Sequence, residues 1–194
     1  MLFSVLHNFV FIKSKKTAST SIECALETLI TGEIGQHRRD AAFLDDGSII
    51  GSRRTNAKKK KNMVEDQSKP FPLNHIGASD IKILIGENAF NKSTIISSIR
   101  CPYDQRISFF HFSKFCSTED CINAKDIGNN EWIKDRFYEF LTSKDHRSEY
   151  KGKEHFYIGE DLIIDKFIRQ ENLEEDLKEV LNSLNCSNEE IEKV

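Results

Sequence analysis

The sequence predicts an α/β fold of three layers, in which a central parallel sheet is flanked by helices. Short segments typical of buried strands alternate with amphipathic helical segments, an order typical of strand–helix–strand units. The 194 residues are 38% hydrophobic, which suffices for one sizeable core in a single domain. Charged residues make up 30% of the chain with nearly balanced signs, which excludes a membrane-embedded protein and a uniformly basic nucleic-acid coat.

The first strand, loop and helix are predicted between Asn8 and Gly32. Asn8–Ile12 is a short apolar run, and Lys13–Thr20 is a polar loop. A helix follows because apolar residues recur at helical spacing, namely Ile22, Ala25, Leu26, Leu29 and Ile30. Gly32 can end this helix. Its start can be capped by one of three hydroxyl side chains, those of Ser19, Thr20 and Ser21.

The middle of the chain repeats this order. Ser79 is expected to cap a second helix that ends at Gly86, with an apolar side formed by Ile81, Leu84 and Ile85. Thr94–Ile99 is rich in β-branched residues and should be a central strand. Pro102 fits the first turn of the next helix, which carries Ile107, Phe109 and Phe110.

The last third predicts a helix, a strand and a final helix. Trp132–Leu141 has a helical pattern, and Leu162–Ile168 is expected to be a strand. Asn172 and Glu175 resemble a capping box at the start of the final helix. One face of that helix is apolar and consists of Leu173, Leu177, Val180, Leu181 and Leu184.

Localisation signals and metal motifs are weak. Met1–Ile12 is interrupted by polar residues and makes a poor signal peptide. The five cysteines are scattered and odd in number, so we expect free thiols in a reducing, cytoplasmic environment. His111, Cys116 and Cys121 lie close in sequence, but there is no CxxC pair and no evident fourth ligand. We therefore expect no metal site.

Charge is unevenly distributed along the chain. His37–Lys61 contains eight basic and three acidic residues, whereas Glu160–Val194 contains four basic and eleven acidic residues. An anionic partner would therefore meet the first half more readily. Residues 52–69 include few apolar side chains, so we expect a flexible, solvated basic loop there.

The loop Lys13–Ser21 is the strongest candidate for chemistry. It brings three lysines and five hydroxyl side chains to a helix N-terminus, where backbone N–H groups and the helix dipole favour an anion. A phosphate-like group is one interpretation. The other is that the hydroxyls cap the helix and the lysines are solvated. The loop lacks the GxxxxGK[ST] pattern of nucleotide triphosphatases.

Three segments resemble one family. Phe11–Ser21 is similar to the 5′-phosphosulfate loop of sulfotransferases that use 3′-phosphoadenosine 5′-phosphosulfate (PAPS), whose core is Lys-Thr-[Gly/Ala]-[Gly/Ser]-Thr-Ser. Ile99–Phe110 resembles their 3′-phosphate segment. Phe167–Asp176 resembles the closing segment of compact bacterial members, which are similar to carbohydrate sulfotransferases. The three segments occur in the family's order.

This resemblance implies a P-loop-like fold for residues 1–194 and a PAPS-dependent sulfotransferase that needs no metal. Lys16 would stabilise charge on the leaving phosphate oxygen. The 5′-phosphate would be held by Lys15, Lys16, Thr17, Ala18, Ser19, Thr20 and Ser21. Arg100 and Ser108 would bind the 3′-phosphate. The alternatives are an ordinary ion pair for Arg100 and a backbone-bonded hydroxyl for Ser108.

Transfer to a hydroxyl acceptor, with a carbohydrate favoured, also requires a general base. His75 is the candidate, because a histidine has a suitable pKa and Asn74–Ser79 resembles the His-x-[Ser/Gly]-Ala segment of bacterial members. A histidine that caps or packs locally is the alternative. His37 is a weaker candidate among arginines, and Glu23 could be a structural neighbour of the loop.

Three other functions stay open. A small P-loop kinase would bind ATP with magnesium. A nucleic-acid-binding module would use the basic residues Arg53, Arg54 and Lys58–Lys61. A noncatalytic relative would keep the fold and bind a partner. The acceptor's identity and the oligomeric state cannot be predicted from these residues.

Overall fold

The computed structural model describes residues 1–33, 35, 41–51, 75–113, 130–143 and 152–194. These form two compact units, which we describe separately: Met1–Ile99 with Lys153–Val194, and Arg100–Gly152. The single sulfotransferase-like domain thus stays a prediction. Some predicted features lie outside the described residues, namely His37, the basic loop 52–69, Cys116 and Cys121. Of the helices described, none combines the length and apolar character needed to cross a membrane.

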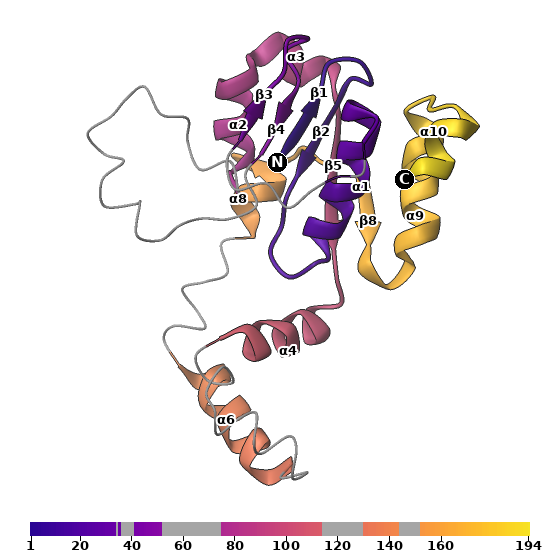
Figure 1. Ribbon diagram of the computed structural model, residues 1–194. Helices are drawn as coiled ribbons and strands as arrows, with labels where there is room; N and C mark the ends of the chain where they lie inside the picture. Colours follow the sequence, from indigo (N-terminus) through magenta and orange to yellow (C-terminus); the bar gives the residue numbers. More distant parts are fainter. Residues whose placement is uncertain (34, 36–40, 52–74, 114–129, 144–151) are drawn as a thin grey trace. The chain divides into compact units, whose positions relative to one another are not determined.

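The first unit is built on a six-stranded sheet with the order β3-β4-β1-β2-β5-β8 (Figure 1). The strands are β1 (Leu2–Ser4), β2 (Phe9–Ile12), β3 (Ala42–Phe43), β4 (Ile49–Ile50), β5 (Thr94–Ile99) and β8 (Lys166–Arg169). The pairs β2–β5 and β5–β8 are parallel, as predicted. The other three pairs are antiparallel. The α/β class is therefore confirmed, with a mixed sheet in which β2, β4, β5 and β8 run in one direction.

The antiparallel half corrects the expected fully parallel sheet. Only the four residues Val5–Asn8 separate β1 from β2. Parallel neighbours need a crossover of about a dozen residues or more. A four-residue connection is too short for that and forces the two strands into an antiparallel hairpin. Asn8 adopts a left-handed conformation with φ 50°, which asparagine tolerates in a tight turn. The apolar stretch at the start of the chain thus forms two strands instead of one.

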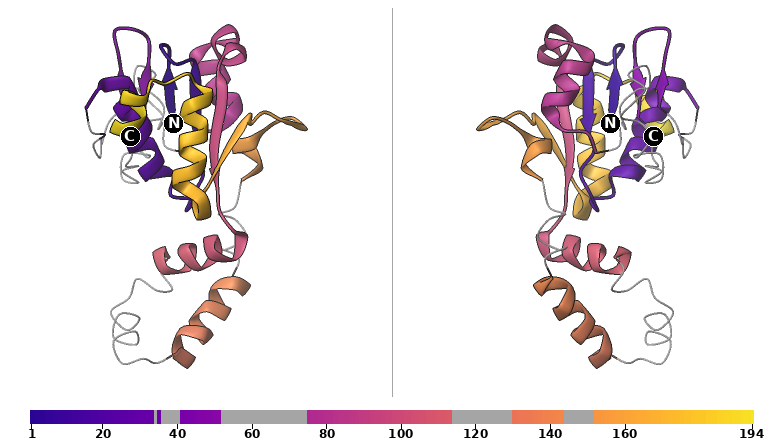
Figure 2. Two further views of the ribbon diagram at one scale, coloured as in Figure 1. Left: turned by 90° about the vertical axis from the view of Figure 1, so that its right-hand side faces the viewer. Right: turned by 90° about the vertical axis from the view of Figure 1, so that its left-hand side faces the viewer.

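Helices cover both faces of this sheet. Alternate residues of β2 point in opposite directions, so Phe9 and Phe11 join one buried cluster while Val10 and Ile12 join another. The first cluster packs against α1 (Ser19–Thr31) and α9 (Leu173–Ser183). The second packs against α2 (Ala78–Ile85) and α3 (Glu87–Lys92). Three layers result, as Figures 1 and 2 show for this unit.

The remaining elements of the first unit are short. They are α8 (Lys153–Phe156), the hairpin of β6 (Tyr157–Ile158) and β7 (Asp161–Leu162), the 3-10 turn η2 (Gln170–Asn172) and α10 (Asn188–Lys193). The strand predicted over Leu162–Ile168 is therefore split into the end of β7 and the beginning of β8. Between them, the Asp165 carboxylate accepts a hydrogen bond from the N–H of Ile95 at 2.7 Å, which fixes the break beside β5.

Two predicted helix caps are wrong in detail. Gly77 is the N-cap of α2, and Ser79 lies inside the helix. Asn172 is the N-cap of α9, but its side chain makes no cap hydrogen bond, so the capping box is not formed. Instead, the buried Asp176 carboxylate accepts hydrogen bonds from the backbone N–H of Arg169 at 2.8 Å and from its guanidinium at 2.7 and 2.8 Å. This contact ties the end of β8 to α9.

The second unit contains α4 (Pro102–Phe112) and α6 (Asn130–Thr142). Pro102 occupies the first turn of α4, as predicted. A small aromatic core joins the two helices and consists of Phe109, Phe110 and Phe140, with Trp132, Ile133 and Phe137 packed against it. Phe110 meets Phe137 edge to face, with ring centroids 5.2 Å apart.

Candidate functional site

The predicted phosphate loop joins the carboxyl end of β2 to α1. In α/β sheets, ligands bind outside the carboxyl ends of the strands. Here β2 pairs with the parallel strand β5, so that Ile12 lies opposite Ser97. The Ser97 hydroxyl donates a hydrogen bond to the carbonyl of Ile12 at 2.8 Å, directly before the loop. The backbone at the start of the loop is therefore held by hydrogen bonding between the two central strands β2 and β5.

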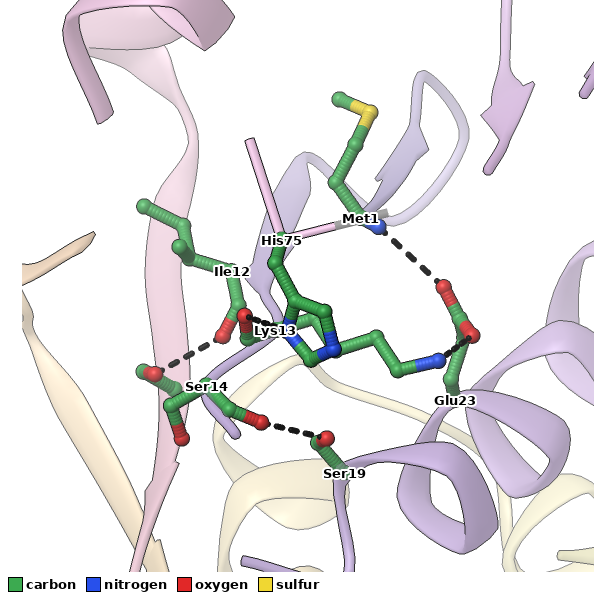
Figure 3. A network of polar contacts seen from close by, with 8 residues as sticks. Met1, Ile12, Lys13, Ser14, Ser19, Glu23 and His75 are labelled. Carbon is green, nitrogen blue, oxygen red and sulfur yellow. Dashed lines mark hydrogen bonds and ion pairs between the residues drawn. The ribbon is translucent and has the colours of Figure 1, made fainter. Parts of the chain in front are cut away.

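Lys13 is a structural residue of this loop. Its ammonium nitrogen lies 2.8 Å from Oε2 of Glu23, and both side chains are almost fully buried, with 2% and 0% exposed. The amino group of Met1 lies 3.2 Å from Oε1 of the same carboxylate (Figure 3). The single Glu23 carboxylate thus serves as counterion to two positive groups inside the protein. Glu23 is therefore a structural neighbour of the loop, which was the role considered for it from the sequence. The ammonium group of Lys13 is bound by Glu23 and is directed away from a ligand.

Hydroxyl groups hold the first half of the loop against β5. The Ser14 hydroxyl donates to the carbonyl of Ser98, and Thr17 Oγ1 lies 2.8 Å from Ser14 Oγ and 2.7 Å from Ser98 Oγ. The Ser19 hydroxyl donates to the carbonyl of Ser14 at 2.6 Å. These four side chains are buried. Thr17 and Ser19 therefore use their hydroxyls to shape the loop, and only their backbone N–H groups would face an anion.

The second half of the loop has an unusual backbone. Lys16 and Ala18 both adopt left-handed conformations, with φ 61° and 58°. A right-handed residue next to a left-handed one can turn successive backbone N–H groups toward one point, where an anion can bind. Ala18 is also the N-cap of α1, and no side chain caps this terminus. The predicted capping by Ser19, Thr20 or Ser21 is therefore wrong, and the positive end of the helix dipole lies at this loop.

The lysines next to this backbone differ in exposure. Lys15 is exposed and Lys16 is half-buried. Thr20 and Ser21 lie in the first turn of α1. All of the 5′-phosphate candidates thus belong to one continuous segment of the first unit.

His75 contacts this loop from a distant part of the sequence. Its Nδ1 lies 3.0 Å from the carbonyl oxygen of Lys13 (Figure 3). A carbonyl can only accept, so Nδ1 carries the proton and the lone pair of the neutral ring resides on Nε2. Burial lowers the pKa of His75 to about 4, and the positive charges of Lys13 and Lys15 add to this shift. The ring is therefore neutral at pH 7.

His155, which the sequence reasoning missed, lies beside His75. It belongs to α8, is buried, and its ring centroid is 6.3 Å from that of His75. Burial lowers its pKa, and the charge of Lys15 lowers it further. Because α8 has only four residues, it carries no periodic pattern that could have identified this histidine.

The predicted 3′-phosphate residues belong to the second unit. Arg100 directly follows β5, and its Nε is buried with no hydrogen-bond partner among the described residues. Ser108 lies within α4 and is half-buried. That Lys16 and Arg100 bind opposite ends of one nucleotide stays a prediction. In the part of the chain that is described, no three His, Cys, Asp or Glu side chains are grouped to hold a metal ion.

Comparisons with family models, with curated proteins and with solved structures found no match for this chain.

Replacing Glu23 by glutamine should destabilise the protein by about 3–5 kcal/mol, because it leaves the Lys13 ammonium buried without a counterion. Urea unfolding followed by circular dichroism measures this loss. Glu33→Gln is the matched control, since Glu33 is exposed beyond the end of α1 and should change the free energy of unfolding by less than about 0.5 kcal/mol. Equal losses in the two variants would contradict a structural role for the buried pair.

Proposed function

We propose that this protein is a PAPS-dependent sulfotransferase that moves a sulfuryl group to a hydroxyl acceptor, with a carbohydrate favoured. The observation that carries the proposal is the hydrogen bond between His75 Nδ1 and the carbonyl of Lys13 at 3.0 Å. It joins the candidate base to the candidate phosphosulfate loop, although 62 positions separate them in the sequence. Sulfuryl transfer needs these two parts, a site for the leaving phosphate and a base for the acceptor proton, close together.

The loop has the chemistry to hold the phosphosulfate end of the donor. Its left-handed residues and the N-terminus of α1 supply backbone N–H groups and a positive dipole. In the transferred group, negative charge grows on the phosphate oxygen as its bond to sulfur breaks. Lys16 would place an ammonium at that oxygen, where fixed positive charge lowers the barrier. By the family resemblance, Arg100 and Ser108 would bind the 3′-phosphate.

His75 has the protonation state that a base requires. In the proposed step, the acceptor oxygen attacks sulfur, the sulfur–phosphate oxygen bond breaks, and Nε2 of His75 takes the hydroxyl proton. The products are a sulfate ester, adenosine 3′,5′-bisphosphate (PAP) and an imidazolium. The hydrogen bond to Lys13 fixes the tautomer that leaves Nε2 as the acceptor. A pKa of about 4 keeps the ring unprotonated near neutral pH.

Lys16→Ala should lower the transfer of radiolabelled sulfate from PAPS by at least about 100-fold, because it removes the ammonium at the leaving oxygen. At saturation, PAP should raise the Tm of the wild type by about 5–10 °C and that of the variant by less. Lys92→Ala, at the exposed end of α3, is the matched control and should behave like the wild type. A Tm rise with magnesium and ATP but none with PAP or PAPS would favour a kinase, and a rise only with oligonucleotides would favour nucleic-acid binding.

His75→Asn should abolish transfer while PAP still raises the Tm. Asparagine tolerates the left-handed conformation of residue 75, with φ 56°, and its amide can keep the hydrogen bond to Lys13, but it offers no group at the place of Nε2. The expected loss in kcat is about 10²- to 10⁴-fold. In the wild type, kcat/KM should rise with pH through about 4 and show no step near 6.5. Activity within threefold of wild type in the variant would refute the base assignment.

The pH dependence of stability gives an independent test of His75. Its pKa is about 4 in the folded protein and about 6.5 when unfolded, so the unfolded chain binds more protons between these values. The contribution of His75 to the free energy of unfolding is fully present above pH 6.5. It falls by roughly 3 kcal/mol as the pH drops toward 4. Urea unfolding at pH 7 and pH 4.5 should show a larger loss for wild type than for His75→Asn. Equal losses would show that the ring is not buried as described.

A further inference from the structure

His155 has a buried polar atom without a hydrogen-bond partner among the described residues. The residue is 8% exposed, and the atom is Nδ1 of its ring. Buried polar atoms in native proteins are nearly always satisfied by protein, water or a ligand, because leaving one unpaired is costly. An apolar residue could fill the same space without this cost. The unpaired atom therefore points to a partner that binds at this place.

The backbone sets the distance between His155 and His75. Their ring centroids are 6.3 Å apart, with the ring planes tilted by 31°. Gly77 lies between α2 and His75, and a Cβ atom at this position would be 3.3 Å from the carbonyl oxygen of Glu154. The φ of Gly77 is −72°, which any residue can adopt, so it is the close approach of α8 that favours glycine here. The two histidine rings are thus held near each other, in a tilted arrangement, by directly packed segments.

The electrostatic surroundings of His75 and His155 suit a ligand that presents uncharged hydroxyl groups next to an anion. Burial keeps both rings uncharged, and the positive charge of Lys15 acts in the same direction on each. A neutral imidazole has one donor and one acceptor nitrogen, which matches the hydroxyl group. Two such rings beside the phosphate-loop lysine can therefore bind two hydroxyls next to a transferable anionic group.

We propose that His155 binds the acceptor through its Nδ1 and selects acceptors with two neighbouring hydroxyls, one facing His75 and the other facing His155. The proposal rests on the sulfotransferase function proposed above and names its substrate class, a vicinal diol such as occurs in carbohydrates. His155 orients the acceptor and takes no proton in the transfer step.

The test compares two small acceptors that differ by one hydroxyl, trans-cyclohexane-1,2-diol and cyclohexanol, with radiolabelled PAPS as donor. The wild type should sulfate the diol with a kcat/KM about 5- to 10-fold higher, as one hydrogen bond would provide. His155→Leu should lose this preference, with the KM for the diol raised and the KM for PAPS unchanged. His155→Asn should restore most of it, because an asparagine amide reaches the place of Nδ1.

Gly77→Ala provides a second variant that keeps His155. It should displace α8 by a few tenths of an ångström and lower the diol preference, while PAP still raises the Tm as in the wild type.

Two negative outcomes of these experiments can be distinguished. If PAP raises the Tm and transfer occurs, but His155→Leu keeps the preference for the diol, the role of His155 is refuted alone. If PAP neither binds nor supports transfer, the sulfotransferase function is refuted and this inference with it.

Discussion

The hydrogen bond from His75 Nδ1 to the carbonyl of Lys13 is the contact on which the candidate site depends. It fixes three properties at once: the position of the ring beside the loop, its tautomer, and the nitrogen that holds the lone pair. Burial then keeps the ring neutral. Without this contact, the loop and the histidine would be two unrelated polar features of the same unit.

The loop is held in place before any ligand binds. The buried pair of Lys13 and Glu23 fixes its beginning, and the hydroxyls of Ser14 and Thr17 fix it to Ser98 on β5. The hydroxyl hydrogen bonds form a consistent chain, since Ser98 Oγ can donate to Thr17, Thr17 to Ser14, and Ser14 to the Ser98 carbonyl. Such a rigid frame suits a site that works by positioning and by fixed charge, because little reorganisation is needed when charge develops.

Much of the central architecture could be predicted from the sequence because hydrophobic periodicity reports directly on burial. The β-branched run Thr94–Ile99 is a strand with these bounds, and Gly32 ends α1 with φ 70°. The antiparallel strands β1, β3 and β4 have only two or three residues each, so they carry almost no pattern. Their positions are set by the hairpin turns and by packing of the whole sheet.

The candidate site was predictable in part. The loop residues and His75 carry chemistry that residue types and the family resemblance can identify. The sequence could not tell that Lys13 is buried against Glu23, because lysines in a polar loop look alike until the fold places them. The sequence also could not tell that Ser97 and Ser98 hold the loop, because it shows only two serines near the end of an apolar strand. His155 meets His75 through tertiary packing alone.

The most direct test of the central claim is a nuclear magnetic resonance titration of the isotopically labelled protein with PAP. If PAP binds the loop beside His75, the backbone amides of Lys16–Ser19 and the ring signals of His75 should shift together, with one dissociation constant. Shifts of the loop amides without any change at His75, or shifts confined to other parts of the protein, would contradict the account.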